Sequence, residues 1–215
     1  MSQADPAARL AALVSADLRR GEYHPRERLV ESDLVTRYGF PRATVRSALV
    51  LLSADGLVER LPNRGASVRS LAIDEGIELA EVRRELEAIC ARDAAVRAEP
   101  EERANLRAGL DAMAYAARSD DVHSYRQTSI GFHDAVIAMS RHTSARRQLA
   151  TIRLHNLQRH FPVAFQTVPL ADSIDDHSDI GDAVIRGDAE AAEQAMRTHL
   201  DRVVTLLRRF RDSRS

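Results

Sequence analysis

The sequence predicts a mainly α-helical protein with one β-hairpin near residue 60. Apolar residues recur at helical spacing in three segments before residue 55, and again from residue 74 almost to the end. Between these regions, 57–61 and 66–69 are short, β-prone segments separated by the turn signal Pro-Asn-Arg-Gly. Aromatic residues make up only 4% of the chain, with no Trp, so Leu, Val, Ile and Ala must build the core. Such a composition suits packed helices.

The first three helices have recognisable ends. Asp5 and Pro6 open the first, because Asp accepts hydrogen bonds from free N–H groups and Pro suits the first helical position. Gly21 stops this helix. A turn over 22–28 is expected next. The second helix is expected over about 30–38 and the third over about 41–54, each followed by glycine within two residues.

Three short helices followed by a hairpin form a winged helix-turn-helix, with the second and third helices as the helix-turn-helix. The start of the third helix carries Arg42, Thr44 and Arg46, and that end of a recognition helix reaches base edges. Arg can donate two hydrogen bonds to guanine, and Thr can add selectivity. Arg64, at the hairpin tip, suits a minor groove or a phosphate. Each alone would be an ordinary solvated residue, but together they predict a DNA-binding surface.

The charge distribution agrees with a DNA-contacting first third. Residues 1–70 hold 11 Arg and 8 acidic residues, a net +3, and residues 71–215 hold 20 Arg and 24 acidic residues, a net −4. All the basic residues are Arg. The single cysteine, Cys90, excludes an internal disulfide framework. No apolar run is long enough for a membrane span, and the start lacks a signal-peptide pattern. We therefore expect a cytoplasmic protein with no membrane partner.

Residues 71–215 are predicted to form an all-helical bundle. Short links join the expected helices, and 161–170, which contains two prolines, is expected to be a loop or kink. The predicted ranges are 74–98, 101–118, 121–139, 144–160, 171–186 and 188–211. The expected domains are therefore a DNA-binding domain, 1–70, and a helical domain, 71–215.

Three histidines of the bundle lie on apolar helix faces: His133, His177 and His199. A histidine in such a position is usually a satisfied core residue. Three of them on three different helices can instead converge on one divalent metal, for which imidazole is a common ligand. The pattern alone leaves both interpretations open.

The first seventy residues resemble the GntR family of bacterial regulators. The family pattern is IxxGxYxPGxxLxExxLAxxxGVSRxPVRxALxxLxxEGLVxxxxNRGxxV, and it matches across about residues 10–69. The matched positions are Gly21, Tyr23, Pro25, Leu29, Glu31, Leu34, Gly39, Arg42, Val45, Arg46, Ala48, Leu49, Leu52, Gly56, Leu57, Val58, Asn63, Arg64, Gly65 and Val68. Arg26 replaces the usual Gly, and Phe40-Pro41 replaces Val-Ser. Ser32 stands where some relatives carry a DNA-contacting Arg, which makes it a further candidate contact.

The remaining residues resemble the FCD ligand-binding domain of the FadR subfamily. The segments 81–95 and 177–200 match the family's opening and closing motifs, and Phe132-His133 matches its Phe-His pair. Many FCD domains bind a divalent metal through one Asp and three His. The resemblance implies that His133, His177 and His199 take the three His positions, with Ser129 at the Asp position. A neutral Ser is a poor ligand, so Zn, Mn or Ni would bind here more weakly.

The resemblance implies a homodimeric transcriptional regulator that binds operator DNA and senses a small molecule. Arg83 matches the Arg of the opening motif and is the candidate for an effector carboxylate, since a guanidinium pairs with carboxylate through two bonds. An ion pair with Glu87, four residues on, is the other interpretation of Arg83. We expect a repressor whose effector is an organic acid, and no enzymatic activity. The alternative is a metal-dependent enzyme that uses the three histidines to activate water.

Overall fold

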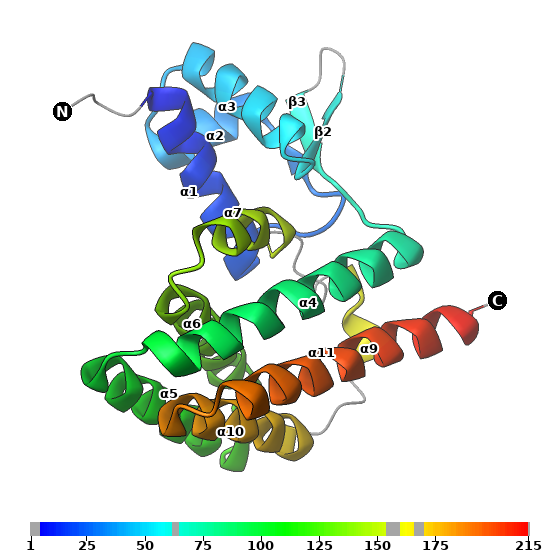
Figure 1. The fold of residues 1–215 in the computed structure, drawn as a ribbon. Coiled ribbons are helices and arrows are strands. Elements are labelled where there is room, and N and C mark those ends of the chain that lie inside the picture. Colours follow the sequence, from blue (N-terminus) through cyan, green and yellow to red (C-terminus); the bar gives the residue numbers. More distant parts are fainter. Residues whose placement is uncertain (1–4, 62–64, 154–159, 166–169, 215) are drawn as a thin grey trace. The chain divides into compact units, whose positions relative to one another are not determined.

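The computed structural model describes residues 5–61, 65–153, 160–165 and 170–214 (Figure 1). The chain forms two compact units. One contains residues 1–72 together with 151–162, and the other contains residues 73–150 and 163–215. The predicted fold class is confirmed, because three helices and a small sheet are followed by helices almost to the end of the chain. Within the described residues, no helix has the length and apolar character needed to cross a bilayer.

The first unit is a three-helix domain with a small sheet. Its helices are α1 (Pro6–Arg20), α2 (Glu31–Tyr38) and α3 (Arg42–Ala54), and its strands are β1 (Arg28–Leu29), β2 (Val58–Leu61) and β3 (Gly65–Val68). The strands are antiparallel in the order β1-β3-β2. The expected turn over 22–28 is therefore partly wrong. Its last residue, Arg28, joins a strand because it and Leu29 pair with Ser67 and Ala66.

Gly21 and Arg26, two residues of this unit, both have a positive φ. Gly21 ends α1 in the left-handed conformation, and its N–H donates to the Asp17 and Leu18 carbonyls. Arg26 also has a positive φ, of 68°. The family pattern has glycine at that position, and glycine adopts this conformation without the steric cost that a Cβ brings. The core of this unit is built mainly of aliphatic side chains from all three helices and the strands, including Leu10, Leu52 and Ala66.

The second unit consists of helices. They are α4 (Ile73–Arg97), α5 (Pro100–Arg118), α6 (Val122–Met139), α7 (Thr143–Ile152), α9 (Pro162–Phe165), α10 (Leu170–Arg186) and α11 (Ala189–Asp212). The helix expected over 144–160 ends at Ile152, and residues 154–159 lie outside the described part. The loop expected over 161–170 contains a short helix, α9. The long helices α4 and α11 lie side by side (Figure 1).

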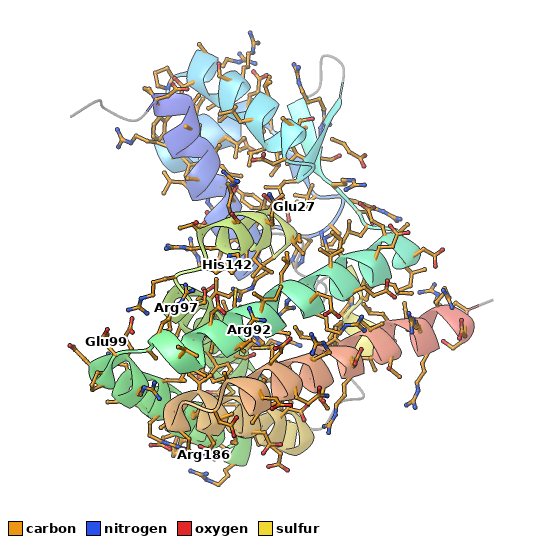
Figure 2. All side chains as sticks on the ribbon, viewed as in Figure 1. Glu27, Arg92, Arg97, Glu99, His142 and Arg186 are labelled. Atoms are coloured by element: carbon orange, nitrogen blue, oxygen red, sulfur yellow. The ribbon has the colours of Figure 1, made fainter. Side chains whose placement is uncertain are left out.

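The helix starts of this unit are set by acidic caps. Asp121 and Asp188 accept hydrogen bonds from the backbone N–H groups of Ser124 and Ala191 at the starts of α6 and α11. Glu99, labelled at the turn between α4 and α5 in Figure 2, forms a capping box with Glu102. These caps determine where each helix begins and hence which of its residues face the core.

Small residues let the helices of the bundle approach closely. The inner face of α4 is lined by fully or almost fully buried alanines, at positions 88, 91, 94 and 95. Gly181 on α10 has the same effect, because a Cβ there would overlap the Leu110 side chain and meet Phe132 Cε2 at 3.3 Å. Gly181 lies one turn after His177, so the close approach brings this part of α10 to the histidine on α6.

Candidate functional site

The predicted recognition helix, α3, presents two exposed arginines. The side chains of Arg42 and Arg46 are 69% and 62% exposed, and their spacing of four places them on one face of the helix. Pro41 occupies the N-cap and makes no side-chain capping bond, as the loss of the family's Ser predicts. Thr44 is half-buried on the same helical turn. The N-terminal end of α3 therefore combines two exposed cations with backbone N–H groups that Pro41 does not cap.

Glu31 holds both arginines and was not identified as a site residue from the sequence. Its Oε2 accepts from Arg42 Nε at 2.8 Å, and its two oxygens accept from Arg46 Nε at 3.0 and 3.1 Å. These bonds lower the pKa of Glu31, the bond from Arg42 contributing most, so the side chain is a carboxylate at neutral pH. Both arginines use Nε here, and within the described residues their terminal –NH2 groups keep their donors for another acceptor. The match of Glu31 to the family pattern was the signal that could have identified it.

The remaining predicted DNA contacts are Ser32 and Arg64. Ser32 is exposed at the start of α2, and its hydroxyl donates to the neighbouring Asp33 carboxylate at 3.1 Å. Arg64, at the predicted hairpin tip, lies outside the described residues. Its neighbour Gly65 is described. A Cβ there would come within 2.6 Å of the Leu29 carbonyl oxygen, so this strand end accepts only glycine.

The three histidines converge in the second unit. His133 on α6, His177 on α10 and His199 on α11 each offer one ring nitrogen, and these atoms all lie within 4.8 Å of one another. The three residues are 3%, 1% and 8% exposed. The sequence predicted this convergence from three separate helix faces. It also left open a core role for each histidine, and the mutual distances favour a shared ligand.

The hydrogen bonds around the cluster orient the three rings. Nδ1 of His133 lies 2.6 Å from Glu87 Oε2, and Nδ1 of His199 lies 3.3 Å from Asp176 Oδ2. Nδ1 of His177 lies 2.6 Å from the backbone carbonyl of residue 173. Because these oxygens accept, each Nδ1 is the protonated nitrogen and each Nε2 carries a lone pair. An acceptor on the distal nitrogen is the usual support of a metal-binding histidine.

Burial keeps two of the three rings, those of His133 and His177, neutral. Burial lowers the pKa of His133 to about 4, although the Glu87 carboxylate opposes this shift. Burial also lowers the pKa of His177 well below its ordinary value, with a further contribution from His199. A neutral imidazole is the form that binds a metal, so protons do not compete for these two nitrogens near pH 7.

Two carboxylates that the sequence did not mark as site residues support the cluster. Glu87 is fully buried, and its second oxygen accepts from Arg83 Nε at 2.7 Å. Asp176 pairs with Arg202 at 2.9 Å in the same way. The Arg83–Glu87 pair is one of the two interpretations left open for Arg83. The four-residue spacing of Glu87 from Arg83 was the available signal, but its contact with His133 joins residues 46 apart.

The hydroxyl-bearing residues Ser129 and Tyr125 also lie beside the histidine cluster. Ser129 Oγ lies 3.1 Å from Nε2 of His177, and it donates because that nitrogen carries a lone pair. Tyr125 packs edge-on against the His177 ring, with centroids 6.3 Å apart. Its hydroxyl is buried and makes no hydrogen bond of normal geometry within the described residues, although Ser173 lies near. The residues present therefore fit a divalent metal: three imidazole nitrogens whose rings are oriented by hydrogen bonds, with no carboxylate ligand among them.

Each of the two units matches a known protein family. Residues 6–68 match the family profile "Bacterial regulatory proteins, gntR family", and residues 78–202 match the profile "FCD domain". The HTH-type transcriptional regulator BphR of Paraburkholderia xenovorans is 27% identical over 91% of this chain and 82% of its own. A probable D-xylose utilization operon transcriptional repressor of Paenarthrobacter nicotinovorans is 30% identical over 79% of this chain and 74% of its own.

The fold is shared with a solved structure. The structure of Escherichia coli McbR/YncC covers 96% of this chain and 99% of its own, with a TM-score of 0.82 at 16% identity. The relatives are named as transcriptional regulators and not as enzymes, so they support the regulator and not the metal-dependent enzyme. The chain belongs to the GntR family of transcriptional regulators and carries a C-terminal FCD ligand-binding domain.

Proposed function

We propose that this protein is a cytoplasmic, homodimeric repressor whose affinity for operator DNA changes when an organic acid binds in its FCD domain. Residues 1–70 would act as the DNA-binding domain and residues 71–215 as the effector-binding and dimerisation domain. The observation that carries the proposal is the buried three-histidine cluster in a chain that also presents two arginines on a recognition helix. Several relatives are named repressors, which supports the direction of regulation.

On the DNA side, Arg42 and Arg46 would read base edges in the major groove, with Thr44 beside them and Ser32 at the start of α2. Arg64 would enter the minor groove or meet a phosphate. A domain of this size makes few base contacts, so two copies related by a two-fold axis would read a palindromic site. The operator can be found by selection from a random DNA pool. The affinity of the protein for that operator should fall as the salt concentration rises.

On the sensing side, the three histidines would hold Zn, Mn or Ni. A bound metal supplies a positive centre that can accept an effector carboxylate. Arg83 Nε donates a hydrogen bond to Glu87. The positive charge of the Arg83 guanidinium is close enough to add to the lowering, mainly by burial, of the pKa of both His133 and His177. The terminal nitrogens of Arg83 would contribute a second attraction for an anionic ligand.

Metal content tests the proposed site directly. The purified protein, incubated with Zn²⁺, Mn²⁺ or Ni²⁺ and then desalted, should carry about one metal per chain by elemental mass spectrometry. His199→Ala should lose most of that metal, since removing one of three ligands leaves two. A control is His142→Ala, which removes an imidazole from outside the cluster. Equal metal in the wild type and His199→Ala would contradict the assignment of the ligands.

Glu31→Gln tests whether the carboxylate positions the recognition arginines. The change should weaken binding to the selected operator about tenfold, because it removes the charge-assisted bonds that hold Arg42 and Arg46. Binding to random DNA should stay the same or become tighter, because a negative charge beside DNA is lost. Fluorescence anisotropy with both DNAs measures the two affinities.

A matched control removes the same charge elsewhere in the unit. Glu59→Gln, at an exposed position on β2, should change operator and random-DNA binding in parallel. If Glu31→Gln behaves like Glu59→Gln, Glu31 acts only through its charge, and the positioning role is wrong.

A further inference from the structure

Helix α2 carries the carboxylate that holds Arg42 and Arg46, but it has little hydrophobic anchorage of its own. It is eight residues long, and Leu34 is the one residue of this helix that is buried. Val30, its N-cap, makes no side-chain capping bond. A helix this short is marginal in water by itself. The orientation of α2 therefore depends on how its other side chains are held by the rest of the unit.

One buried carboxylate on α1 fastens the end of α2. Asp17 lies in the last turn of α1 and is 6% exposed. Its Oδ2 accepts from the Tyr38 hydroxyl at 2.6 Å and from a terminal nitrogen of Arg37 at 2.9 Å. Its Oδ1 accepts from Arg20 of the same helix. Hydrogen bonds to a charged group are stronger than those between neutral groups, so this carboxylate forms a strong polar link between α1 and α2.

Two tyrosine rings and a guanidinium complete the link. Burial raises the pKa of Tyr38 far above its ordinary value, so its hydroxyl keeps its proton and donates to Asp17. The Tyr23 hydroxyl, 3.1 Å away, therefore donates to the Tyr38 oxygen. The Arg37 guanidinium lies over both rings, 4.9 Å from the centroid of Tyr23 and 5.6 Å from that of Tyr38. A polar network whose members satisfy one another favours a single arrangement, here that of the last turn of α2 against α1.

Both ends of α2 act on the predicted recognition helix. Tyr38 is the last residue of α2, and three residues separate it from the start of α3 at Arg42. At the other end of α2, Glu31 accepts from Arg42 and Arg46. Glu31 and Tyr38 are seven residues apart, close to two helical turns, so they lie on the same side of α2. A rotation of α2 would therefore move Glu31 together with the arginines that it holds.

We infer that Asp17 is a positioning residue for operator recognition. Through Tyr38 and Arg37 it fixes the orientation of α2, and α2 in turn holds the arginines of α3 through Glu31. Asp17 is itself buried and acidic, so it acts through these contacts and not by binding the DNA backbone. The inference rests on the proposed role of α3, because two hydrogen bonds from one guanidinium to guanine require a defined direction of approach.

Asp17→Asn tests this role with a small change of shape. The amide keeps one acceptor oxygen but loses the charge that binds both Tyr38 and Arg37. In the full chain, affinity for the selected operator should fall about fivefold to tenfold, and affinity for random DNA should not fall. Tyr38→Phe removes one hydroxyl of the network and should lower the ratio of the two affinities about threefold. Fluorescence anisotropy, well below the midpoint of thermal unfolding of each variant, measures both affinities.

A core substitution on α1 separates positioning from stability. Val14 is 1% exposed in the core of the same unit. Val14→Ala removes buried volume but no hydrogen bond of Asp17, so it should lower the midpoint of thermal unfolding, measured by circular dichroism. It should leave the ratio of operator to random-DNA affinity unchanged, since the folded molecules still hold α2 in place.

A double substitution tests the route from Asp17 to the arginines. If Asp17 acts through Glu31, Asp17→Asn should lower the affinity ratio little further in a protein that already carries Glu31→Gln. Two independent effects would multiply, and multiplied losses would overturn the route through Glu31.

Arg46→Ala, which removes a proposed base contact, distinguishes failure of this inference from failure of the proposed recognition helix. If Arg46→Ala lowers the affinity ratio and Asp17→Asn does not, α3 reads the operator and the positioning role of Asp17 is overturned. An Asp17→Asn protein that resembles Val14→Ala, with a lower unfolding midpoint and an unchanged ratio, leads to the same conclusion. If Arg46→Ala also leaves the ratio unchanged, the assignment of α3 is wrong and the inference fails with it.

Discussion

Arg46→Ala is expected to weaken binding to the selected operator about 5- to 150-fold, the range for one bidentate contact between arginine and a base. Arg46 is 62% exposed, and its only described partner is Glu31. The substitution removes no core contact, and alanine favours the helix, so the domain should stay folded. Anisotropy titration against the operator and against variants of it measures both the loss and the base position at which specificity relaxes.

The control for Arg46 is another exposed arginine of the same unit. Arg9→Ala, on α1, removes the same charge and should reduce operator affinity only by the general electrostatic amount, with no change in base preference. If Arg46→Ala and Arg9→Ala lower operator affinity equally, the arginine acts only through its charge. The assignment of α3 as the recognition helix would then fail.

Glu87→Ala is expected to destabilise the helical domain by about 3–5 kcal/mol, the usual loss when one partner of a buried ion pair is removed. Glu87 is fully buried between Arg83 and His133, at 2.7 and 2.6 Å. Without the carboxylate, the Arg83 guanidinium and the His133 Nδ1–H lose their acceptor inside the bundle. The midpoint of thermal unfolding should fall by about 6–20 °C, measured by circular dichroism on metal-free protein.

A glutamate on the surface of the same helix provides the comparison. Glu78 on α4 is exposed, and Glu78→Ala should change the free energy of unfolding by no more than about 0.5 kcal/mol. Glu87→Gln keeps an acceptor oxygen for His133 and should lie between the two alanine variants. A Glu87→Ala protein as stable as Glu78→Ala would show that the bundle does not depend on this pair.

The elements of the fold were largely predictable because their signals are local. Apolar spacing, capping residues such as Asp5 and Asp188, and the glycine after α1 each act within one or two helical turns. The strand β1 was missed because its two residues become a strand only by pairing with β3, about 38 residues further on. The short helix α9 was missed because the two prolines of the segment 161–170 indicated a loop.

The sequence by itself determined the kind of protein and predicted which residues would bear its chemistry. Helical spacing placed Arg42 and Arg46 on one face, and the family resemblance marked the three histidines and the loss of an acidic ligand at Ser129. Only the tertiary structure decided how these residues are supported. The contacts of Glu31 with α3, of Glu87 with His133 and of Asp176 with His199 join residues 11 to 46 apart. Such contacts form when helices pack, so no short stretch of sequence carries their signal.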